Sequence, residues 1–302
     1  MINKITGFHI EATNICTLKC SACARTRFIE QWPQHWKNHS LDVDVLMKFI
    51  DIDISGKTLN FCGNYGDPIY HPKFHDLISA CKIRGAKISV TTNGSYRDTE
   101  WWTRLCDILN EDDIMVFSID GSPENFTIYR ENADWKSIKI GIDVCSKSKA
   151  RVGWKYIPFL YNQNDIEKTK QLALALGVDE FIISPSDRFD EKTQHLIPTL
   201  EFIGDRYQSQ ESFKKGQSVK VDPKCQTGHE HFIAATGHYV PCCYLADHRF
   251  YYKNLFGKEK NKFDIRNTTL TKLLSDLKVI KFYDSITEIP NLGCQYNCPK
   301  KS

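Results

Sequence analysis

The stretch Cys16-Thr-Leu-Lys-Cys20-Ser-Ala-Cys23 sets three cysteines close together, directly after an apolar run at residues 7–13 that we expect to form the first strand. Thiolate ligands at this density suit an iron–sulfur cluster or zinc. Structural zinc sites usually draw their ligands as pairs, so a fourth ligand would have to come from a matching pair elsewhere. Three close cysteines without a fourth predict a cluster with one open iron, which can bind a substrate or a cofactor.

Short apolar, β-branched runs then alternate with helical patterns. The runs are bounded by Gly, Pro, Asn or Asp, and they predict five further strands at residues 57–62, 86–92, 114–120, 151–158 and 180–184. Helices are expected at residues 73–84, 99–110 and 165–176, the last with a capping box formed by Asn164 and Glu167. Six strands separated by helices at a pitch of about 30 residues indicate βαβ units, and hence an α/β fold with a mostly parallel sheet.

The composition is that of an ordinary globular protein. Of 302 residues, 41% are hydrophobic and 25% charged, which excludes disordered and fibrous classes. A net charge of +3 without a basic block gives no support for nucleic-acid binding. Neither a membrane-spanning apolar run of about 18 residues nor a secretory signal is found, so we expect a cytoplasmic protein. Twelve cysteines are too few for a disulfide scaffold and too clustered for a reducing compartment unless some bind metal.

The C-x₃-C-x₂-C run resembles the signature of the radical S-adenosylmethionine (SAM) superfamily, whose fold is a partial (β/α)₆ barrel. The resemblance implies a [4Fe–4S] cluster held by Cys16, Cys20 and Cys23, whose open iron chelates the amino and carboxylate groups of SAM. A reductase such as flavodoxin or ferredoxin would reduce the cluster. Cleavage of SAM then gives a 5′-deoxyadenosyl radical that abstracts a substrate hydrogen. The family usually has a large residue before the third cysteine, where this chain has Ala22.

Residues at the ends of later strands resemble the SAM contacts of the family. Residues 61–68, Phe-Cys-Gly-Asn-Tyr-Gly-Asp-Pro, resemble its Gly-Gly-Glu-Pro motif, in which a backbone carbonyl accepts from the SAM ammonium. The alternatives are a simple turn here and a solvated helix residue at Arg130. The resemblance implies a ribose-side contact from Asn93, a carboxylate clamp from Ser118 and Arg130, and a cap or ribose contact from Asp120. The cofactor-binding candidates are therefore Tyr65, Gly66, Asp67, Asn93, Ser118, Asp120 and Arg130.

The alternation stops near residue 185. We expect a barrel over residues 1–185, a connector over 186–221 with one helix at 194–206, and a small cysteine-rich domain over 222–302. A hairpin is expected to turn at Thr236-Gly237. Cysteines within strands and helices are expected to pack in the core, and histidines near the hairpin to be solvated loop residues. These are Cys62, Cys81, Cys106 and Cys145, and His229, His231 and His238.

The C-terminal cysteines resemble the SPASM/Twitch auxiliary-cluster domain of radical SAM enzymes, including its Gly-x₄-Cys element at residues 237–242. The resemblance implies one auxiliary [4Fe–4S] cluster held by Cys225, Cys242, Cys294 and Cys298, with Cys243 as the alternate to Cys242. A structural zinc ribbon is the alternative. Full cysteine ligation would leave the cluster to conduct or accept an electron, and substrate coordination through a displaced ligand is the rival role.

The expected function is hydrogen abstraction followed by oxidation or rearrangement of a small polar metabolite. The alternative substrate is a side chain of a ribosomally made peptide or protein. Maturases of such peptides often carry a leader-binding domain, for which the first cluster at Cys16 leaves no room at the N-terminus, and this favours a small substrate. Methyl transfer and tRNA modification also occur in the family. A non-enzymatic zinc- or cluster-binding redox regulator is the alternative of another class, and it would not turn over SAM.

Overall fold

Eight strands form one curved sheet in the order β6-β5-β4-β3-β2-β1-β7-β8 in the computed structural model, which describes residues 5–204, 206–207, 210, 213, 216, 219–227 and 231–300. Strands β1 to β6 are parallel to their neighbours. This confirms the expected α/β fold. The strands are β1 Gly7–Ile10, β2 Thr58–Phe61, β3 Lys87–Thr92, β4 Ile114–Ser118, β5 Arg151–Tyr156, β6 Glu180–Ile183, β7 His231–Ile233 and β8 Tyr239–Val240.

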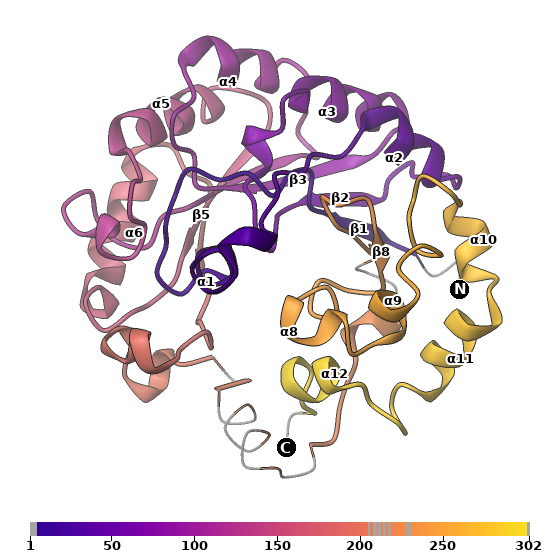
Figure 1. Cartoon of the computed structure of the whole chain (residues 1–302). Helices are drawn as coiled ribbons and strands as arrows, with labels where there is room; N and C mark the ends of the chain where they lie inside the picture. The colour runs from indigo at the N-terminus through magenta and orange to yellow at the C-terminus, as the bar shows by residue number, and fades with distance from the viewer. Residues whose placement is uncertain are drawn as a thin grey trace.

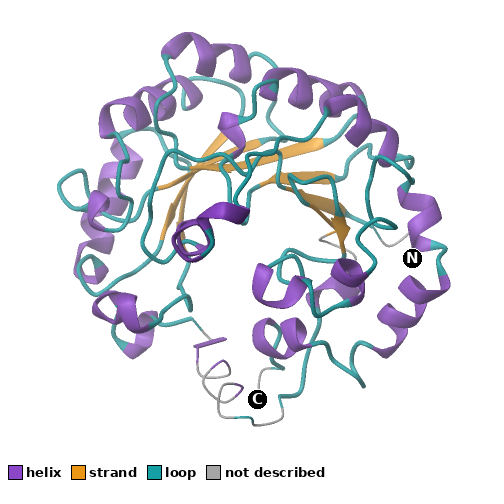
Figure 2. Ribbon diagram, in the orientation of Figure 1, coloured by secondary structure: helices purple, strands orange, loops and turns teal. Residues whose placement is uncertain are grey.

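Helices cover the outer side of the sheet, and the strands lie inside the ring of helices (Figure 2). Most of the ring comes from the helices between successive strands, while α1 overlies the middle of the ring in the view of Figure 1. The first six helices are α1 Ala24–Gln31, α2 Val43–Phe49, α3 Phe74–Ile83, α4 Thr99–Cys106, α5 Trp135–Cys145 and α6 Ile166–Ala175. The C-terminal helices are α8 His248–Tyr251, α9 Leu255–Lys258, α10 Leu270–Leu274, α11 Leu277–Ser285 and α12 Leu292–Asn297.

The two faces of the sheet differ in polarity because side chains alternate along a strand. Phe8, Leu59 and Ile88 are paired across β1, β2 and β3, and all three are buried. The next row, with Asn60 and Ser89, is polar and only half-buried. The apolar rows therefore pack under the helices, and the polar rows face the interior of the barrel.

The predicted hairpin is confirmed, and it extends the barrel sheet. Strand β7 pairs antiparallel with β8, and Gly237 in the turn has φ +78°, a conformation that favours glycine. Strand β7 also pairs in parallel with β1, with Phe8 opposite His231. The expected boundary before residue 222 thus falls within one continuous sheet, and the three domain extents stay a prediction.

Several local expectations were wrong. Helix α6 begins after Asp165 without a side-chain cap, so the capping box at Asn164 is not formed. The expected helix at 194–206 is replaced by two 3₁₀ turns, Glu191–Leu196 and Leu200–Phe202, because Pro198 lies between them. The other short 3₁₀ turns are Pro33–His35, Pro68–Tyr70, Phe126–Ile128, Gln163–Asp165 and Lys224–Thr227.

His231, expected in a solvated loop, is buried in β7. His238 is half-buried, and His229 lies outside the described residues. Cys81, Cys106 and Cys145 are buried in the core as expected. Within the part of the chain that the structure describes, no helix has the length and apolar character needed to cross a membrane.

Candidate functional site

The three N-terminal cysteines lie on one loop between β1 and α1. Cys20 is buried, Cys16 and Cys23 are half-buried, and Cys23 is the N-cap residue of α1. The loop is folded by a bond from Cys23 N to Cys20 O (3.1 Å) and by one from Lys19 N to Glu131 O (3.1 Å). Burial, followed by the nearby Asp67 charge, raises the pKa of the Cys16 thiol to about 12. The Cys16 thiolate therefore needs a positively charged centre, such as a bound metal, to stabilise its charge.

The loop after β2 packs directly on the backbone next to the cysteines. A Cβ atom on Gly66 would lie 1.9 Å from Thr13 O, so only glycine permits this approach. Asp67 N donates to Ile15 O (2.9 Å). Tyr65 N donates to the carboxylate of the buried Glu11 (2.7 Å). The simple-turn alternative is therefore insufficient, because the turn is fitted to the cysteine loop.

Asp67 is bonded to the end of β3. Its carboxylate accepts from Asn93 N and Asn93 Nδ2 (2.6 Å each) and from Thr92 Oγ1 (2.8 Å). Asn93 Nδ2 also lies 3.6 Å from Cys16 Sγ. Asp67 thus fixes Asn93 beside the cysteine loop. Tyr65 and Gly66 contribute backbone groups of the loop after β2.

Ser118, Asp120 and Arg130 are brought together at the end of β4. The fully buried Asp120 accepts from Arg130 Nε (2.7 Å) and from Ile157 N (2.8 Å). Ser118 is buried at the last position of the strand. Arg130 follows the 3₁₀ turn Phe126–Ile128 rather than lying on a helix, and its charge opposes the rise of the Cys20 pKa that burial causes. Arg130 is therefore an interior residue close to the cysteine loop, and not a solvated one.

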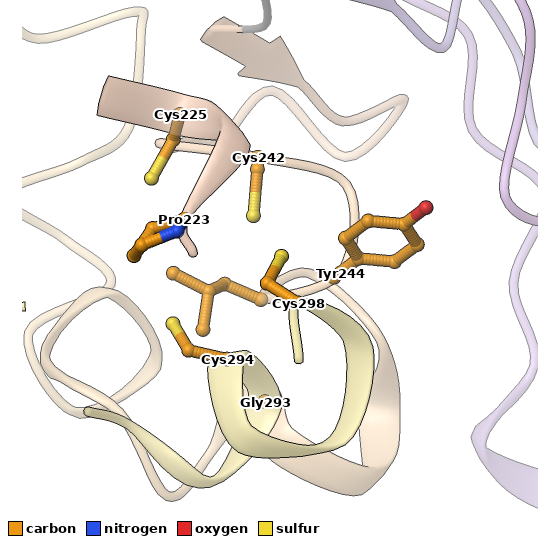
Figure 3. Close-up of a pocket in the computed structure, with 8 residues that line it drawn as sticks. Pro223, Cys225, Cys242, Tyr244, Gly293, Cys294 and Cys298 are labelled. Atoms are coloured by element: carbon orange, nitrogen blue, oxygen red, sulfur yellow. The ribbon is translucent and has the colours of Figure 1, made fainter. Parts of the chain in front are cut away.

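A second group of cysteines lines one pocket in the C-terminal region. Cys225, Cys242, Cys294 and Cys298 are each less than 10% exposed, although they come from a 3₁₀ turn, a loop and α12. Figure 3 shows their four sulfur atoms directed into the same space. Cys243 is half-buried and does not line this pocket. The geometry thus groups the four predicted ligands and separates the alternate from them.

The donor set suits a cluster better than a single ion. Across the described residues, no three His, Cys, Asp or Glu side chains converge where one metal ion could bind them. A tetrahedral zinc site with bonds of about 2.3 Å would bring its sulfur atoms to within about 3.8 Å of one another. In an iron–sulfur cluster each thiolate binds a different iron, so the sulfur atoms stand further apart. Four buried thiols around a pocket fit that arrangement.

Three contacts that the sequence did not reveal join the two cysteine sites. Asn64 Nδ2 donates to Cys243 O (2.8 Å), and His248 N donates to Tyr65 Oη (2.9 Å). Glu11 accepts from Tyr65 N and from Ala235 N (3.3 Å), which follows β7. Glu11 and His248 are isolated in the sequence, and their partners are far along the chain, so no spacing signal marks them.

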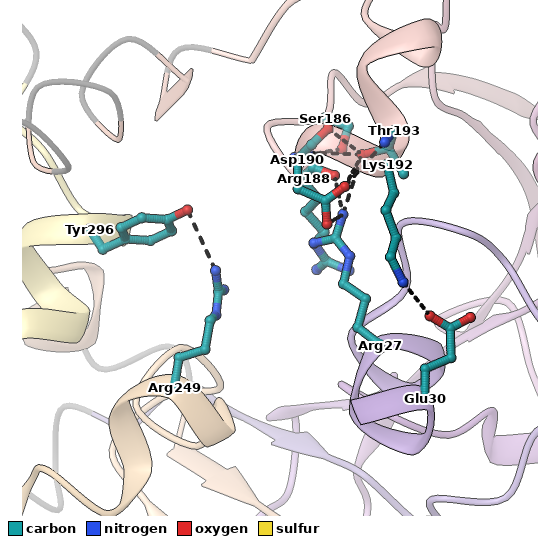
Figure 4. A network of polar contacts seen from close by, with 9 residues as sticks. All are labelled: Arg27, Glu30, Ser186, Arg188, Asp190, Lys192, Thr193, Arg249 and Tyr296. Atoms are coloured by element: carbon teal, nitrogen blue, oxygen red, sulfur yellow. Dashed lines mark hydrogen bonds and ion pairs between the residues drawn. The ribbon is translucent and has the colours of Figure 1, made fainter. Parts of the chain in front are cut away.

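A polar network joins α1 to the segment after β6 (Figure 4). Arg27 forms an ion pair with Asp190 (3.0 Å) and donates to Arg188 O (3.1 Å), while Lys192 pairs with Glu30 (3.2 Å). This network fixes the segment that carries Arg188 against the helix that follows the three cysteines.

A cleft lies between α1 and the C-terminal region, beyond the ends of β1 and β7. Its volume of about 280 Å³ is just below the range for small-molecule pockets, about 300–1,000 Å³. Aromatic and basic side chains predominate in its lining, and Glu11 is its single acidic residue. The named lining residues that bear on its chemistry are Phe28, Trp36, Tyr65, His248, Lys37 and Lys260.

Comparisons with known proteins agree with this geometry. The sequence profile of the Radical SAM superfamily matches residues 10–173. A Pyrococcus furiosus protein, the tungsten-containing aldehyde ferredoxin oxidoreductase cofactor-modifying protein, is 24% identical over 200 residues, covering 58% of this chain and 50% of its own. The chain thus spans about half the length of that curated relative.

Solved structures share the fold at low identity. Streptococcus suis SuiB bound to precursor peptide SuiA has a TM-score of 0.63 at 11% identity, covering 97% of this chain and 70% of its own. Native anSMEcpe with AdoMet and Kp18Cys peptide has a TM-score of 0.58 at 15% identity, with coverages of 94% and 84%. BtrN in complex with AdoMet and 2-DOIA has a TM-score of 0.54 at 13% identity, with coverages of 99% and 94%.

Proposed function

The chain belongs to the radical SAM superfamily, and from this premise we propose an enzyme that abstracts a hydrogen atom from a small polar metabolite and oxidises or rearranges it. When bound, a reduced [4Fe–4S] cluster and SAM supply a 5′-deoxyadenosyl radical, and an auxiliary [4Fe–4S] cluster supplies an electron acceptor. The role of the protein chain is to hold these groups, to orient the substrate between them and to exclude water.

The N-terminal residues divide into ligands and positioning residues in this proposal. Cys16, Cys20 and Cys23 hold the catalytic cluster. The backbone at Tyr65 and Gly66 faces the SAM ammonium, and Ser118 with Arg130 holds the SAM carboxylate. Two buried carboxylates position these groups, since Asp67 fixes Asn93 near the ribose side and Asp120 orients Arg130.

The observation that carries the proposal is the pocket lined by Cys225, Cys242, Cys294 and Cys298. A second site with four buried thiols suits an electron acceptor, as the oxidation of a substrate radical requires. The zinc-ribbon alternative needs three or more ligands converging on one ion, and the described residues offer no such group. A flavodoxin or ferredoxin is the proposed electron donor to the catalytic cluster.

The test is SAM cleavage by the protein reconstituted anaerobically with iron and sulfide and reduced by dithionite. Formation of 5′-deoxyadenosine that depends on Cys16, Cys20 and Cys23 is the expected result. A protein that carries both clusters and binds SAM but forms no 5′-deoxyadenosine would instead be the non-enzymatic redox regulator.

A peptide substrate is the second candidate. The solved neighbours include SuiB with a precursor peptide and anSMEcpe with the Kp18Cys peptide, whereas BtrN holds 2-DOIA. The modest size of the cleft favours the small molecule. Mass spectrometry of small precursor peptides encoded beside this chain, after incubation with the active enzyme, decides between the two classes.

A further inference from the structure

One wall of the cleft is built from aromatic rings that three separate segments contribute. Phe28 lies on α1, Trp36 on the segment after it, and Tyr65 in the loop after β2. Their ring centroids lie 5.8 Å (Phe28 to Trp36), 6.1 Å (Trp36 to Tyr65) and 6.3 Å (Phe28 to Tyr65) apart. We call these three residues the aromatic wall. Such a wall can pack against the apolar face of a small molecule.

His248, at the first position of α8, is fixed beside this wall. Helices α1 and α8 lie next to each other (Figure 1), and the His248 ring meets the rings of Phe28 (5.3 Å) and Trp32 (5.5 Å) edge-on. Nδ1 of His248 lies 3.2 Å from Tyr65 Oη, which also accepts from His248 N (2.9 Å). Within the described residues no protein group hydrogen-bonds Nε2 of His248. The ring is therefore held at its Nδ1 side, and Nε2 is the polar atom that it can offer a ligand in the cleft.

Tyr251, at the last position of α8, lines the same cleft. Residues three apart lie on one face of a helix, so α8 presents His248 and Tyr251 on the same side. The Tyr251 Oη atom is buried and has no hydrogen-bond partner among the residues that the structure describes. A buried polar atom without a partner is rare in folded proteins and costs free energy. A hydroxyl group of a ligand in the cleft would supply the missing partner.

The enclosed part of the cleft offers hydrogen bonds rather than a free charge. Lys37 and Lys260 line the cleft, but both residues are exposed to solvent. Both carboxylate oxygens of Glu11 accept from backbone N–H groups. Burial lowers the pKa of His248 and the neighbouring Asp247 opposes this, so the ring is neutral near pH 7. A neutral imidazole has one donor and one acceptor, and Nε2 can therefore bond a hydroxyl group in either tautomer.

The cleft adjoins the segments that carry both cysteine sites. Phe28 lies on the helix that has Cys23 as its N-cap residue, and Tyr65 precedes Gly66, which packs on the backbone beside the cysteine loop. On the other side, α8 follows Cys242 closely in the chain. A molecule in the cleft thus lies between the two cysteine-bearing segments, where the proposed function needs its substrate.

We propose that this cleft binds the substrate, with His248 Nε2 and Tyr251 Oη hydrogen-bonded to its hydroxyl groups and the aromatic wall packed against the apolar face of its ring. The inference rests on the proposed function and narrows the substrate class to small ring molecules with neighbouring hydroxyl groups. His248 and Tyr251 then determine the specificity of substrate binding.

The probe is cis-1,2-cyclohexanediol, a ring with two adjacent hydroxyl groups, added to the protein that carries both clusters and SAM. Saturation-transfer difference NMR without a reductant measures its binding without turnover. We expect saturable transfer to the diol. Cyclohexanol lacks one hydroxyl group and glycerol lacks the ring. Each should bind about three- to tenfold more weakly, as the loss of a hydrogen bond or of apolar burial predicts.

Substitutions on α8 separate this role from a structural one. Tyr251→Phe should weaken diol binding about three- to tenfold without lowering the free energy of unfolding, because the hydroxyl that it removes has no partner among the described residues. His248→Asn keeps a polar atom near the position of Nδ1 but none near Nε2, and it should weaken binding similarly. His248→Gln, with its amide near the position of Nε2, should retain most of the binding. His75→Asn on α3 is the control and should leave binding unchanged, because His75 Nε2 already donates to Trp101 O (3.0 Å).

Three outcomes overturn the inference. The first is the absence of saturable transfer to the diol in the unmodified protein. The second is unchanged diol binding in both Tyr251→Phe and His248→Asn. The third is displacement of the diol when SAM is added to protein that lacks it, which would assign the cleft to SAM. Failure of SAM cleavage would refute the proposed enzyme separately, because diol binding is measured without turnover.

Discussion

Asp67 binds both amide groups of Asn93, the backbone N and the side-chain Nδ2, at 2.6 Å each. The same Nδ2 lies 3.6 Å from Cys16 Sγ. The acidic residue of the strand-end motif thus acts on the cofactor site through its neighbour, and it fixes the end of β3 against the cysteine loop.

Asp67→Asn is expected to lower SAM affinity at least tenfold while iron loading persists. An amide has one acceptor oxygen where the carboxylate has two, so a buried donor of Asn93 or Thr92 loses its partner, at a cost of about 1–3 kcal/mol in the free energy of unfolding. Equilibrium dialysis with SAM and urea unfolding measure the two effects. Asp112→Asn, which removes an exposed partner of Lys87, is the control, and an equal effect there would contradict the assignment.

Gly66→Ala is expected to prevent correct packing of the strand-end loop. The added Cβ would lie 1.9 Å from Thr13 O, and the backbone on both sides cannot move aside. We therefore expect the free energy of unfolding to fall by about 3 kcal/mol or more, and the N-terminal cluster to load poorly. Gly56→Ala is the matched control, because Gly56 has φ +70° but open space around it. This change should lower the free energy of unfolding by about 1 kcal/mol. Similar unfolding curves for the two variants would show that the contact with Thr13 is relieved.

Iron analysis of single cysteine variants should separate the auxiliary ligands from the alternate. Replacing any one of Cys225, Cys242, Cys294 or Cys298 by alanine should lower the iron content from about eight to about four per chain, because a Cys₄ cluster loses a ligand. Cys243→Ala should keep about eight. Zinc remaining in a variant without Cys16, Cys20 and Cys23 would favour the zinc ribbon.

The sequence predicted the strands that carry their own signal, since short β-branched runs end at turn residues. The predicted strands are too long where the chain leaves the sheet but stays apolar, as at residues 157–158 after β5. It could not place β7 beside β1, because that pairing joins segments more than 200 residues apart. It could not choose between Cys242 and Cys243 either, because adjacent residues differ only in the direction of their side chains.

The sequence predicted the site residues that a motif spacing marks, but not those that only tertiary contacts bring to the site. The C-x₃-C-x₂-C run indicated its loop, but Glu11 is a lone acid whose partners, Tyr65 N and Ala235 N, are distant in sequence.

Arg130→Met should destabilise the fold and weaken SAM binding, and the double variant should separate the two effects. The single change leaves the buried Asp120 carboxylate without its cation, at a cost of about 3–5 kcal/mol. Asp120→Asn combined with Arg130→Met should recover much of that stability but not the SAM affinity. Arg151→Met is the control, because Arg151 forms an exposed ion pair with Glu180; it should lower the free energy of unfolding by at most about 1 kcal/mol. SAM affinity restored in the double variant would contradict a direct role for Arg130.

His231→Gln should reduce the dependence of stability on pH. Burial lowers the pKa of His231 to about 4, and the ring is enclosed by the hydroxyls of Tyr239 (2.6 Å) and, beyond it, Tyr283. The unfolded chain, with a histidine pKa of about 6.5, binds the extra proton first, so stability is complete above that value and falls as the pH drops towards 4. Between pH 7 and pH 5 this group accounts for about 2 kcal/mol, which urea unfolding of the protein and of His231→Gln at both pH values measures. An unchanged slope in the variant would show that His231 is not the titrating group.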